Sequence, residues 1–135
     1  MTKHQSEGER RAQILRSARS VFIEKGFVAA RVEDVAKRAG LSKGAVYFYF
    51  PSKRDLFMAL VREEHENTYS FLEKAESDDR DAVVKVLDLG QKYVEYFAGL
   101  KTPPKFFLMM CEMAVRDEEI REECQAIHQR FVDSV

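Results

Sequence analysis

Helical periodicity through almost the whole chain is the feature that most limits its fold. Apolar residues recur at spacings of three and four from about residue 9 to the end, as in the stripe Ile14, Ala18, Val21 and Phe22. An alternating strand pattern never lasts beyond a few residues. Helices with apolar stripes must bury them against one another, so the sequence predicts an all-α fold.

Glycines and small polar residues divide this pattern into seven predicted helices. Gly26 and Gly40 stand where a left-handed residue is favoured after a helix, and Phe27 can fold back onto the first stripe. Ser42 and Ser52 can cap the helices that follow them. The predicted helices cover about residues 9–25, 32–39, 43–49, 53–74, 80–98, 105–115 and 117–135, with a loop at 99–104.

Charge is strongly segregated along the chain. Residues 1–54 carry a net charge of +7 and residues 55–135 one of −8, although the whole chain has a net charge of only −1. A basic first part joined to an acidic remainder indicates contact with a polyanion such as nucleic acid. The alternative is a chance distribution of charges over solvated faces.

Several classes of protein find little support in the sequence. The chain has no run of about 18 apolar residues and no signal peptide, so a cytoplasmic protein is expected. Cys111 and Cys124 lack metal-ligand spacing and are predicted to be buried, reduced thiols, and His65 and His128 have no clustered partners. We expect no metal and no cofactor. Without a Ser-His-Asp order, a phosphate loop or a metal triad, an enzyme is not expected either.

Residues 31–50 form the most informative segment. Two short predicted helices are joined there at a Gly-x-Ser turn, which is the arrangement of a helix-turn-helix. Gly40 allows a tight reversal, and Ala36 is small enough for the helices to cross closely. Ser42 leaves free amide groups at the start of the second helix, where a phosphate can bind. The major groove of DNA is wide enough to admit that helix.

The pattern around this segment closely resembles the TetR family of bacterial regulators over about residues 9–60. The matching motifs read RxxILxxAxxxF from Arg11, GF from Gly26, and VxxVAxxAGLSKGxVYxYFxSKxxL from Val32. The resemblance implies an N-terminal three-helix DNA-binding domain at 8–68, with the helix-turn-helix at about 31–50. It also implies a helical effector-binding and dimerisation region at 69–135, which we expect to be short at its C-terminus.

The resemblance further implies which residues contact DNA. They are Arg31, Ser42, Lys43, Gly44, Ala45, Tyr47, Phe48, Tyr49 and Lys53. Lys53 and the Tyr49 hydroxyl are expected at phosphates, and Tyr47 and Phe48 at the groove. Two positions depart from the family: Arg31 replaces a capping Ser or Thr, and Phe48 replaces a residue that is often polar. The alternatives are packing roles for Tyr47 and Phe50, and a minor-groove arm containing Arg10 and Arg11.

The function implied is that of a repressor released from a palindromic operator by a small apolar effector. The expected partners are operator DNA, the effector and, if the C-terminal interface is present, a second copy of the chain. The candidate effector pocket comprises Tyr93, Tyr96, Phe97, Phe107, Met110 and Met113, for which a plain core role is the alternative. The alternative function is a ligand-independent DNA-binding or protein-interaction module.

Overall fold

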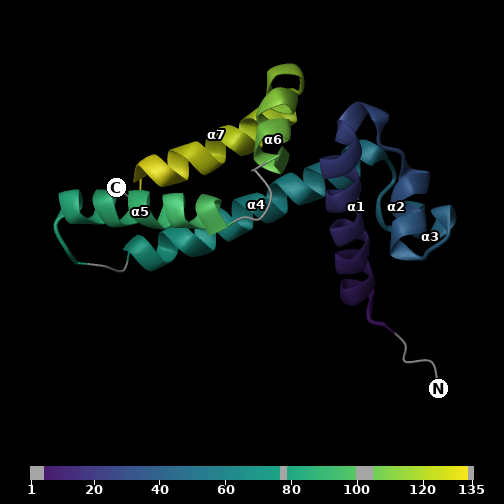
Figure 1. Ribbon diagram of the computed structural model, residues 1–135, viewed down its shortest axis with the longest axis horizontal. Helices are drawn as coiled ribbons and strands as arrows, with labels where there is room; N and C mark the ends of the chain where they lie inside the picture. Colours follow the sequence, from purple (N-terminus) through teal and green to yellow (C-terminus); the bar gives the residue numbers. More distant parts are fainter. Residues whose placement is uncertain (1–4, 77–78, 100–104, 134–135) are drawn as a thin grey trace. The chain divides into compact units, whose positions relative to one another are not determined.

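The computed structural model describes residues 5–76, 79–99 and 105–133, and its regular structure in these ranges is entirely helical (Figure 1). The helices are α1 (Glu7–Ala29), α2 (Val32–Ala39), α3 (Lys43–Tyr49), α4 (Lys53–Glu76), α5 (Ala82–Gly99), α6 (Lys105–Arg116) and α7 (Glu118–Asp133). The all-α prediction is confirmed. Gly99 is helical rather than part of the predicted loop, and residues 100–104 lie outside the described ranges.

The chain divides into two compact units, a first unit of Met1–Leu60 and a second unit of Val61–Val135. Helix α1 of the first unit begins at Glu7 because Ser6 and Glu9 form a capping box. The Ser6 hydroxyl accepts a hydrogen bond from the Glu9 amide at 3.2 Å, and the Glu9 carboxylate accepts one from the Ser6 amide at 3.0 Å. Arg10 and Arg11 are therefore helical, and their contact with a minor groove stays an untested alternative.

Gly26 bends the end of α1. Its φ of 78° is positive as predicted, but its ψ of 165° places it outside the left-handed region expected for this residue, in a region that residues with a side chain rarely enter. The predicted helix end at residue 25 is too early, because a further turn closes with the Ala30 amide bonded to the Gly26 carbonyl at 3.1 Å. This bend stacks Phe27 on Phe22, with ring centroids 5.8 Å apart, and sets Phe27 edge-on to Phe57 at 5.3 Å.

The reversal between α2 and α3 follows the predicted chemistry. Gly40 has φ 68° and ψ 31°, and the Leu41 amide donates to the Ala36 carbonyl at 2.9 Å, which closes the end of α2. The Ser42 hydroxyl accepts a hydrogen bond from the Ala45 amide at 3.1 Å and caps α3. As a result α2 and α3 lie next to each other, joined by a very short connection (Figure 1).

The core of the first unit draws apolar side chains from α1 to α4. The largest are completely buried, and burial of each such side chain contributes about 1.5–3 kcal/mol. The buried residues are Ile14, Leu15, Ala18, Val21, Phe22, Ala30, Val32, Val35, Ala36, Ala39, Val46, Phe50, Leu56, Phe57, Met58 and Leu60. The packing role considered for Phe50 is confirmed by its 3% exposure.

The second unit rests on a contact between α6 and α7 and on polar links from α4. Phe106 and Met110 of α6 and Ile120 of α7 are buried. From α4, Arg62 pairs with Glu119 of α7 at 3.0 Å, and His65 Nδ1 lies 3.0 Å from Glu123 of the same helix. The hydrogen bond from His65, together with Arg62, lowers the pKa of the Glu123 carboxyl.

Apolar side chains in the second unit are also found at the surface. On α5 they are Val83, Val84, Val86, Leu87 and Val94, and on α6 and α7 they are Phe107, Leu108, Val115 and Val132. Both cysteines are free thiols, as predicted. Cys111 is exposed, however, because α6 has more apolar positions than its contact with α7 covers. Within the described ranges, no helix has the length and apolar character needed to cross a membrane.

Candidate nucleic-acid interface

The residues of α3 separate into a buried side and an exposed side. Val46 is completely buried. Lys43, Gly44, Tyr47 and Phe48 are exposed, at spacings that place them on one face of a helix. The structure therefore brings these four predicted contact residues together, and Ser42 is exposed at the start of the same helix. Ala45 and Tyr49 lie between the two sides and are half-buried.

Phe48 is the most exposed aromatic side chain of this face, with 76% of its surface open to solvent. Its ring lies edge-on to that of Tyr49, with centroids 5.1 Å apart. Tyr47 is 40% exposed, and the Lys43 ammonium lies 5.7 Å from its ring centroid. An exposed apolar ring of this kind suits contact with a thymine methyl group, which is the one apolar feature of the major groove.

Lys43 already has an ionic partner in the structure. Its ammonium donates to Glu33 Oε1 at 2.5 Å, so the first turn of α3 is tied to the first turn of α2. The hydrogen bond with Lys43 lowers the pKa of the Glu33 carboxyl, and the same bond raises the pKa of Lys43. Both side chains are about half exposed, so solvent and other charges can reach the pair.

Arg31 is exposed at the start of α2 and makes no capping bond with its side chain. The predicted loss of the family's capping residue is partly offset, because the Asp34 carboxylate accepts a hydrogen bond from the Arg31 amide at 3.0 Å. Asp34 also pairs with Lys25 at 3.0 Å, and the hydrogen bond from Lys25 lowers the pKa of its carboxyl. Asp34 thus holds the start of α2, and the Arg31 guanidinium is not used for capping.

Lys53, the first residue of α4, has partners that sequence reasoning missed. Its ammonium donates to the carbonyls of Phe27 and Val28 at 2.6 and 3.2 Å and lies 4.5 Å from the Phe27 ring centroid. These carbonyls follow the bend at Gly26 and need hydrogen-bond donors from elsewhere in the chain. The Gly-Phe pair in the sequence could have indicated this need, because it predicts a break in the helix. An ammonium has three N–H groups, so the third can still reach a phosphate.

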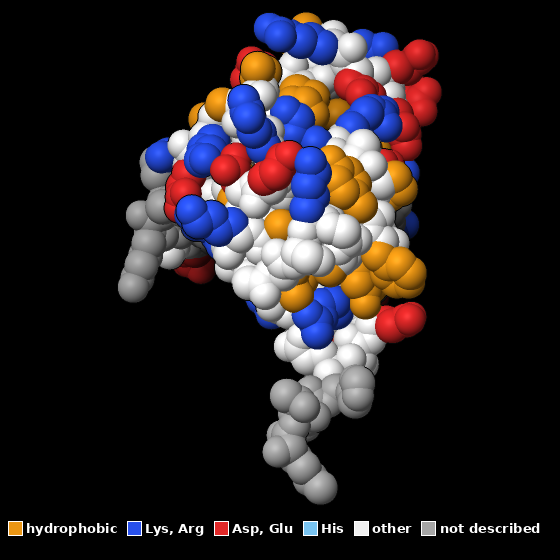
Figure 2. Space-filling view, turned by 90° about the vertical axis from the view of Figure 1, so that its right-hand side faces the viewer, with side chains coloured by type: hydrophobic (Ala, Val, Ile, Leu, Met, Phe, Trp, Pro, Cys, Tyr) orange, Lys and Arg blue, Asp and Glu red, His pale blue; other side chains and the backbone are white. Residues whose placement is uncertain are grey.

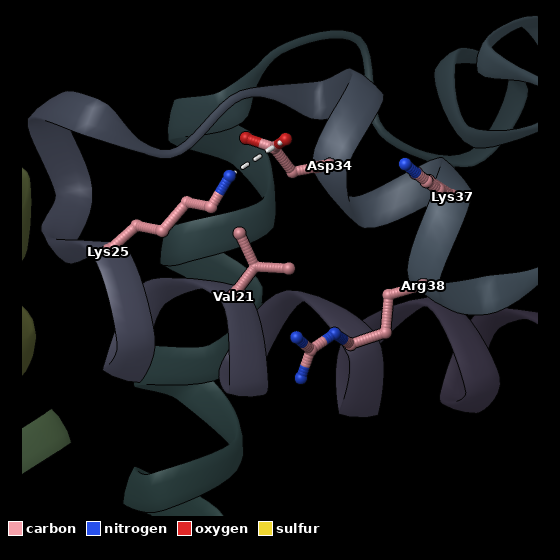
Figure 3. A pocket seen from close by; sticks show the side chains of 5 residues that line it. All are labelled: Val21, Lys25, Asp34, Lys37 and Arg38. Atoms are coloured by element: carbon pink, nitrogen blue, oxygen red, sulfur yellow. Dashed lines mark ion pairs between the residues drawn. The ribbon is translucent and has the colours of Figure 1, made fainter.

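A polar surface pocket of about 300 Å³ lies between α1 and α2, and the sequence did not predict it. Its lining residues are Val21, Lys25, Asp34, Lys37 and Arg38. Figure 3 shows the ion pair between Lys25 and Asp34, with Arg38 extending from α2 on the other side of Val21. Arg38 forms two hydrogen bonds to Glu24, at 2.7 and 2.6 Å, so two of the three cations already have acidic partners.

The predicted effector pocket is only partly described. The side chains of Tyr93, Tyr96 and Phe97 lie outside the described residues. Of the others, Phe107 is 45% exposed, Met110 is 3% exposed and Met113 is half-buried. The apolar pocket therefore stays a prediction. In the described part of the chain, no group of three or more His, Cys, Asp or Glu side chains could hold a metal ion.

Figure 2 shows the side of the molecule on which α2 and α3 lie in Figure 1. Basic side chains are distributed across this side, with hydrophobic side chains between them and a smaller number of acidic ones. Cationic groups interleaved with exposed apolar groups can neutralise phosphates and contact base edges in the same complex.

The segment that contains this candidate interface matches a known protein family. Residues 14–60 match the family described as bacterial regulatory proteins of the tetR family. The matched segment begins in α1 and ends in the first part of α4, so it includes α2, α3 and the core beneath them.

Curated relatives and solved structures extend the similarity beyond residue 60. The transcriptional activator FasR of Mycolicibacterium smegmatis is 32% identical over 91 residues, which is 65% of this chain and 42% of FasR. The fatty acid metabolism regulator protein of Bacillus subtilis is 33% identical over 122 residues, 90% of this chain and 61% of the relative. A TetR-family regulator of Mesorhizobium loti superposes with a TM-score of 0.81 at 19% identity, covering 97% of this chain and 66% of that one. The chain thus spans less than two thirds of the length of these curated relatives.

Proposed function

The chain belongs to the TetR family of bacterial regulatory proteins, and from this premise we propose that it is a sequence-specific DNA-binding transcriptional regulator. The observation that carries the proposal is the exposed face of α3, where Lys43, Tyr47 and Phe48 project from a helix whose other side is anchored by buried Val46. A rigid helix with basic and aromatic groups on its open face fits the major groove.

In the proposed complex, α3 enters the major groove and the residues around it contact the backbone. Lys43, the Tyr49 hydroxyl and the third N–H of Lys53 neutralise or bond phosphates, which fixes the register of the helix. Phe48 contacts thymine methyl groups, and Arg31 at the start of α2 reaches a phosphate or a guanine. We assign DNA binding to residues 8–68 and regulation to residues 69–135.

Selection from a random DNA library tests this function directly. The selected sequence should be a palindrome with half-sites about one helical turn apart, because two copies of α3 then read successive major grooves. Binding to the selected duplex at about 100–200 mM salt should exceed binding to a scrambled duplex by about 10³-fold or more. Equal affinity for the two duplexes would contradict sequence-specific binding.

Phe48 gives a residue-level test of base reading. Phe48→His replaces the exposed ring by a polar one, and the selected operator should lose thymines at the contacted position, a change of about 1–3 kcal/mol in discrimination. Val115→His is the matched control, since Val115 is also an exposed apolar residue but lies on α6 outside the candidate effector pocket, and it should leave the operator unchanged. An operator that is unchanged by Phe48→His would assign Phe48 to packing.

We further propose that the regulator is a repressor and that a small apolar molecule releases it from DNA. Support comes from the similarity to the Bacillus subtilis fatty acid metabolism regulator and from the apolar residues around Phe107 and Met110. A saturated long-chain fatty acid is the probe. It should raise the thermal unfolding temperature of the full chain and weaken operator binding. By linkage, the operator should weaken fatty-acid binding by the same factor. If a panel of apolar compounds changes neither quantity, the ligand-independent alternative holds.

A further inference from the structure

The ion pair between Lys43 and Glu33 joins a predicted DNA contact to an acidic residue of the neighbouring helix. The Lys43 ammonium donates to Glu33 Oε1, and the two side chains are 49% and 55% exposed. We propose that Glu33 is a specificity-determining residue, which occupies the Lys43 ammonium so that non-specific DNA must displace a carboxylate before it gains this cation. The inference rests on the proposed function.

The position of the pair supports this role. The first unit has other exposed ion pairs, such as Arg38 with Glu24 and Lys25 with Asp34, but those cations are not among the predicted DNA contacts. Glu33 stays ionised, because its hydrogen bond from Lys43 lowers the pKa of its carboxyl. Since the pair is half exposed, a phosphate that is held in place by other contacts can compete with it.

The consequence differs between random DNA and the operator. On random DNA, binding depends almost entirely on the number of phosphates that the protein neutralises, so an occupied lysine reduces affinity for every sequence. On random DNA no contact fixes α3, so the Lys43 ammonium stays on Glu33 and this phosphate contact is lost. On the operator, base contacts fix α3 with a phosphate beside the ammonium, so the exchange of carboxylate for phosphate takes place. Glu33 therefore removes from random DNA a contact that the operator keeps, which raises the ratio of the two affinities.

Glu33→Gln in the full chain tests the inference, with Glu24→Gln as a matched control. Both changes remove one negative charge from an exposed ion pair in the first unit, and the two carboxylate side chains are 55% and 51% exposed. The probes are two labelled duplexes of about 30 base pairs, one of random sequence and one carrying the selected operator, titrated at several salt concentrations. On the random duplex, Glu33→Gln should tighten binding by up to about eightfold at 0.1 M salt and steepen the log–log slope by about one unit per bound helix. On the operator duplex the gain should be smaller, so the ratio of the two affinities falls. Glu24→Gln should change the slope much less.

A double variant separates pairing with Lys43 from a general effect of charge. In a Lys43→Gln background, Glu33→Gln should no longer steepen the slope, because the cation that it releases is absent. Three results would overturn the inference while leaving the proposed function intact: equal slopes for Glu33→Gln and Glu24→Gln, an unchanged effect in the Lys43→Gln background, or an equal gain in affinity on the random and operator duplexes. If the unsubstituted chain binds no duplex even at low salt, the proposed function fails and the inference fails with it.

Discussion

The two units of the chain use apolar residues differently. In the first unit, the apolar residues of α1, α2 and α4 are mostly buried, and the large exposed ones are Val28, Tyr47 and Phe48, in or near the candidate interface. In the second unit, exposed apolar residues occur on α5, α6 and α7, while the described buried ones are few. An exposed apolar side chain is uncommon in the first unit and therefore marks a candidate contact there. In the second unit exposed apolar side chains are frequent, so exposure alone does not mark a contact.

This contrast implies that one substitution should have different effects in the two units. The largest difference is expected for removal of an aromatic ring. Phe57→Ala deletes a completely buried side chain that packs edge-on against Phe22 and Phe27, and it should cost about 3–5 kcal/mol of unfolding free energy. Phe107→Ala, at a 45% exposed position of the second unit, should cost about 1 kcal/mol or less. Urea unfolding followed by circular dichroism measures both, and similar costs would remove the contrast.

Replacing a glycine by alanine should change the unfolding free energy in opposite directions in the two units. Gly26→Ala forces a side chain onto a residue with φ 78°, which should cost about 1–3 kcal/mol. Gly90 lies within α5 with open space around it, so Gly90→Ala should stabilise the chain by about 0.5–1 kcal/mol. Thermal unfolding of the two variants should therefore shift in opposite directions, and shifts of equal sign would contradict the backbone assignment.

Lys53 tests whether the interface and the core of the first unit can be separated. Lys53→Met keeps the apolar stem but removes two hydrogen bonds to the carbonyls after Gly26, which should cost about 1–2 kcal/mol without DNA. If Lys53 also binds a phosphate, the salt dependence of DNA binding becomes shallower by about one unit per bound helix. Lys85→Met on α5 is the control and should change stability by less than about 0.5 kcal/mol. A stability loss with an unchanged slope would leave Lys53 only its structural role.

Acid should produce the smallest differences. The carboxyls of Glu24 and Glu123 both have lowered pKa values in the folded chain, through their bonds to Arg38 and to His65 respectively. Their stabilising contributions are therefore complete above about pH 4.5, the ordinary glutamate value, and are lost as the pH falls through the lower folded values. Glu123→Gln should remove more of this acid sensitivity than Glu24→Gln, because Glu123 is less exposed and bonds to two partners. Urea midpoints at pH 6 and pH 3.5 give the comparison.

In the first unit, the sequence predicted the helix ends to within one or two residues wherever a local cap or glycine determines them. Helices α2 and α3 begin and end as predicted, since Gly40 and Ser42 determine the backbone around them. The start of α1 was missed by two residues because the capping role of Ser6 was overlooked. Resemblance to the family supplied the list of contact residues, and the structure places four of them on one exposed face.

Contacts between residues distant in sequence were not predictable in this way. The bonds from Lys53 to the carbonyls of Phe27 and Val28 join positions about 25 residues apart, and they depend on the bend at Gly26. The pairing of Lys43 with Glu33 depends on how α2 and α3 cross, which periodicity does not specify. The exposure of Cys111 depends on how much of α6 its neighbour covers, and an apolar pattern alone does not reveal this.

In the proposed DNA complex, the shortness of α3 limits how many genomic sites one copy can distinguish. Its seven residues make a helix about 10 Å long, which faces about three base pairs. Three base pairs carry about six bits of information, whereas a single address among about 10⁶ sites needs about twenty. One copy would thus match on the order of ten thousand addresses, and two copies a few hundred. The missing bits must come from outside this face of α3. A guanine read by Arg31 is one source, and base pairs that no side chain touches are another, through the ease with which they bend and twist.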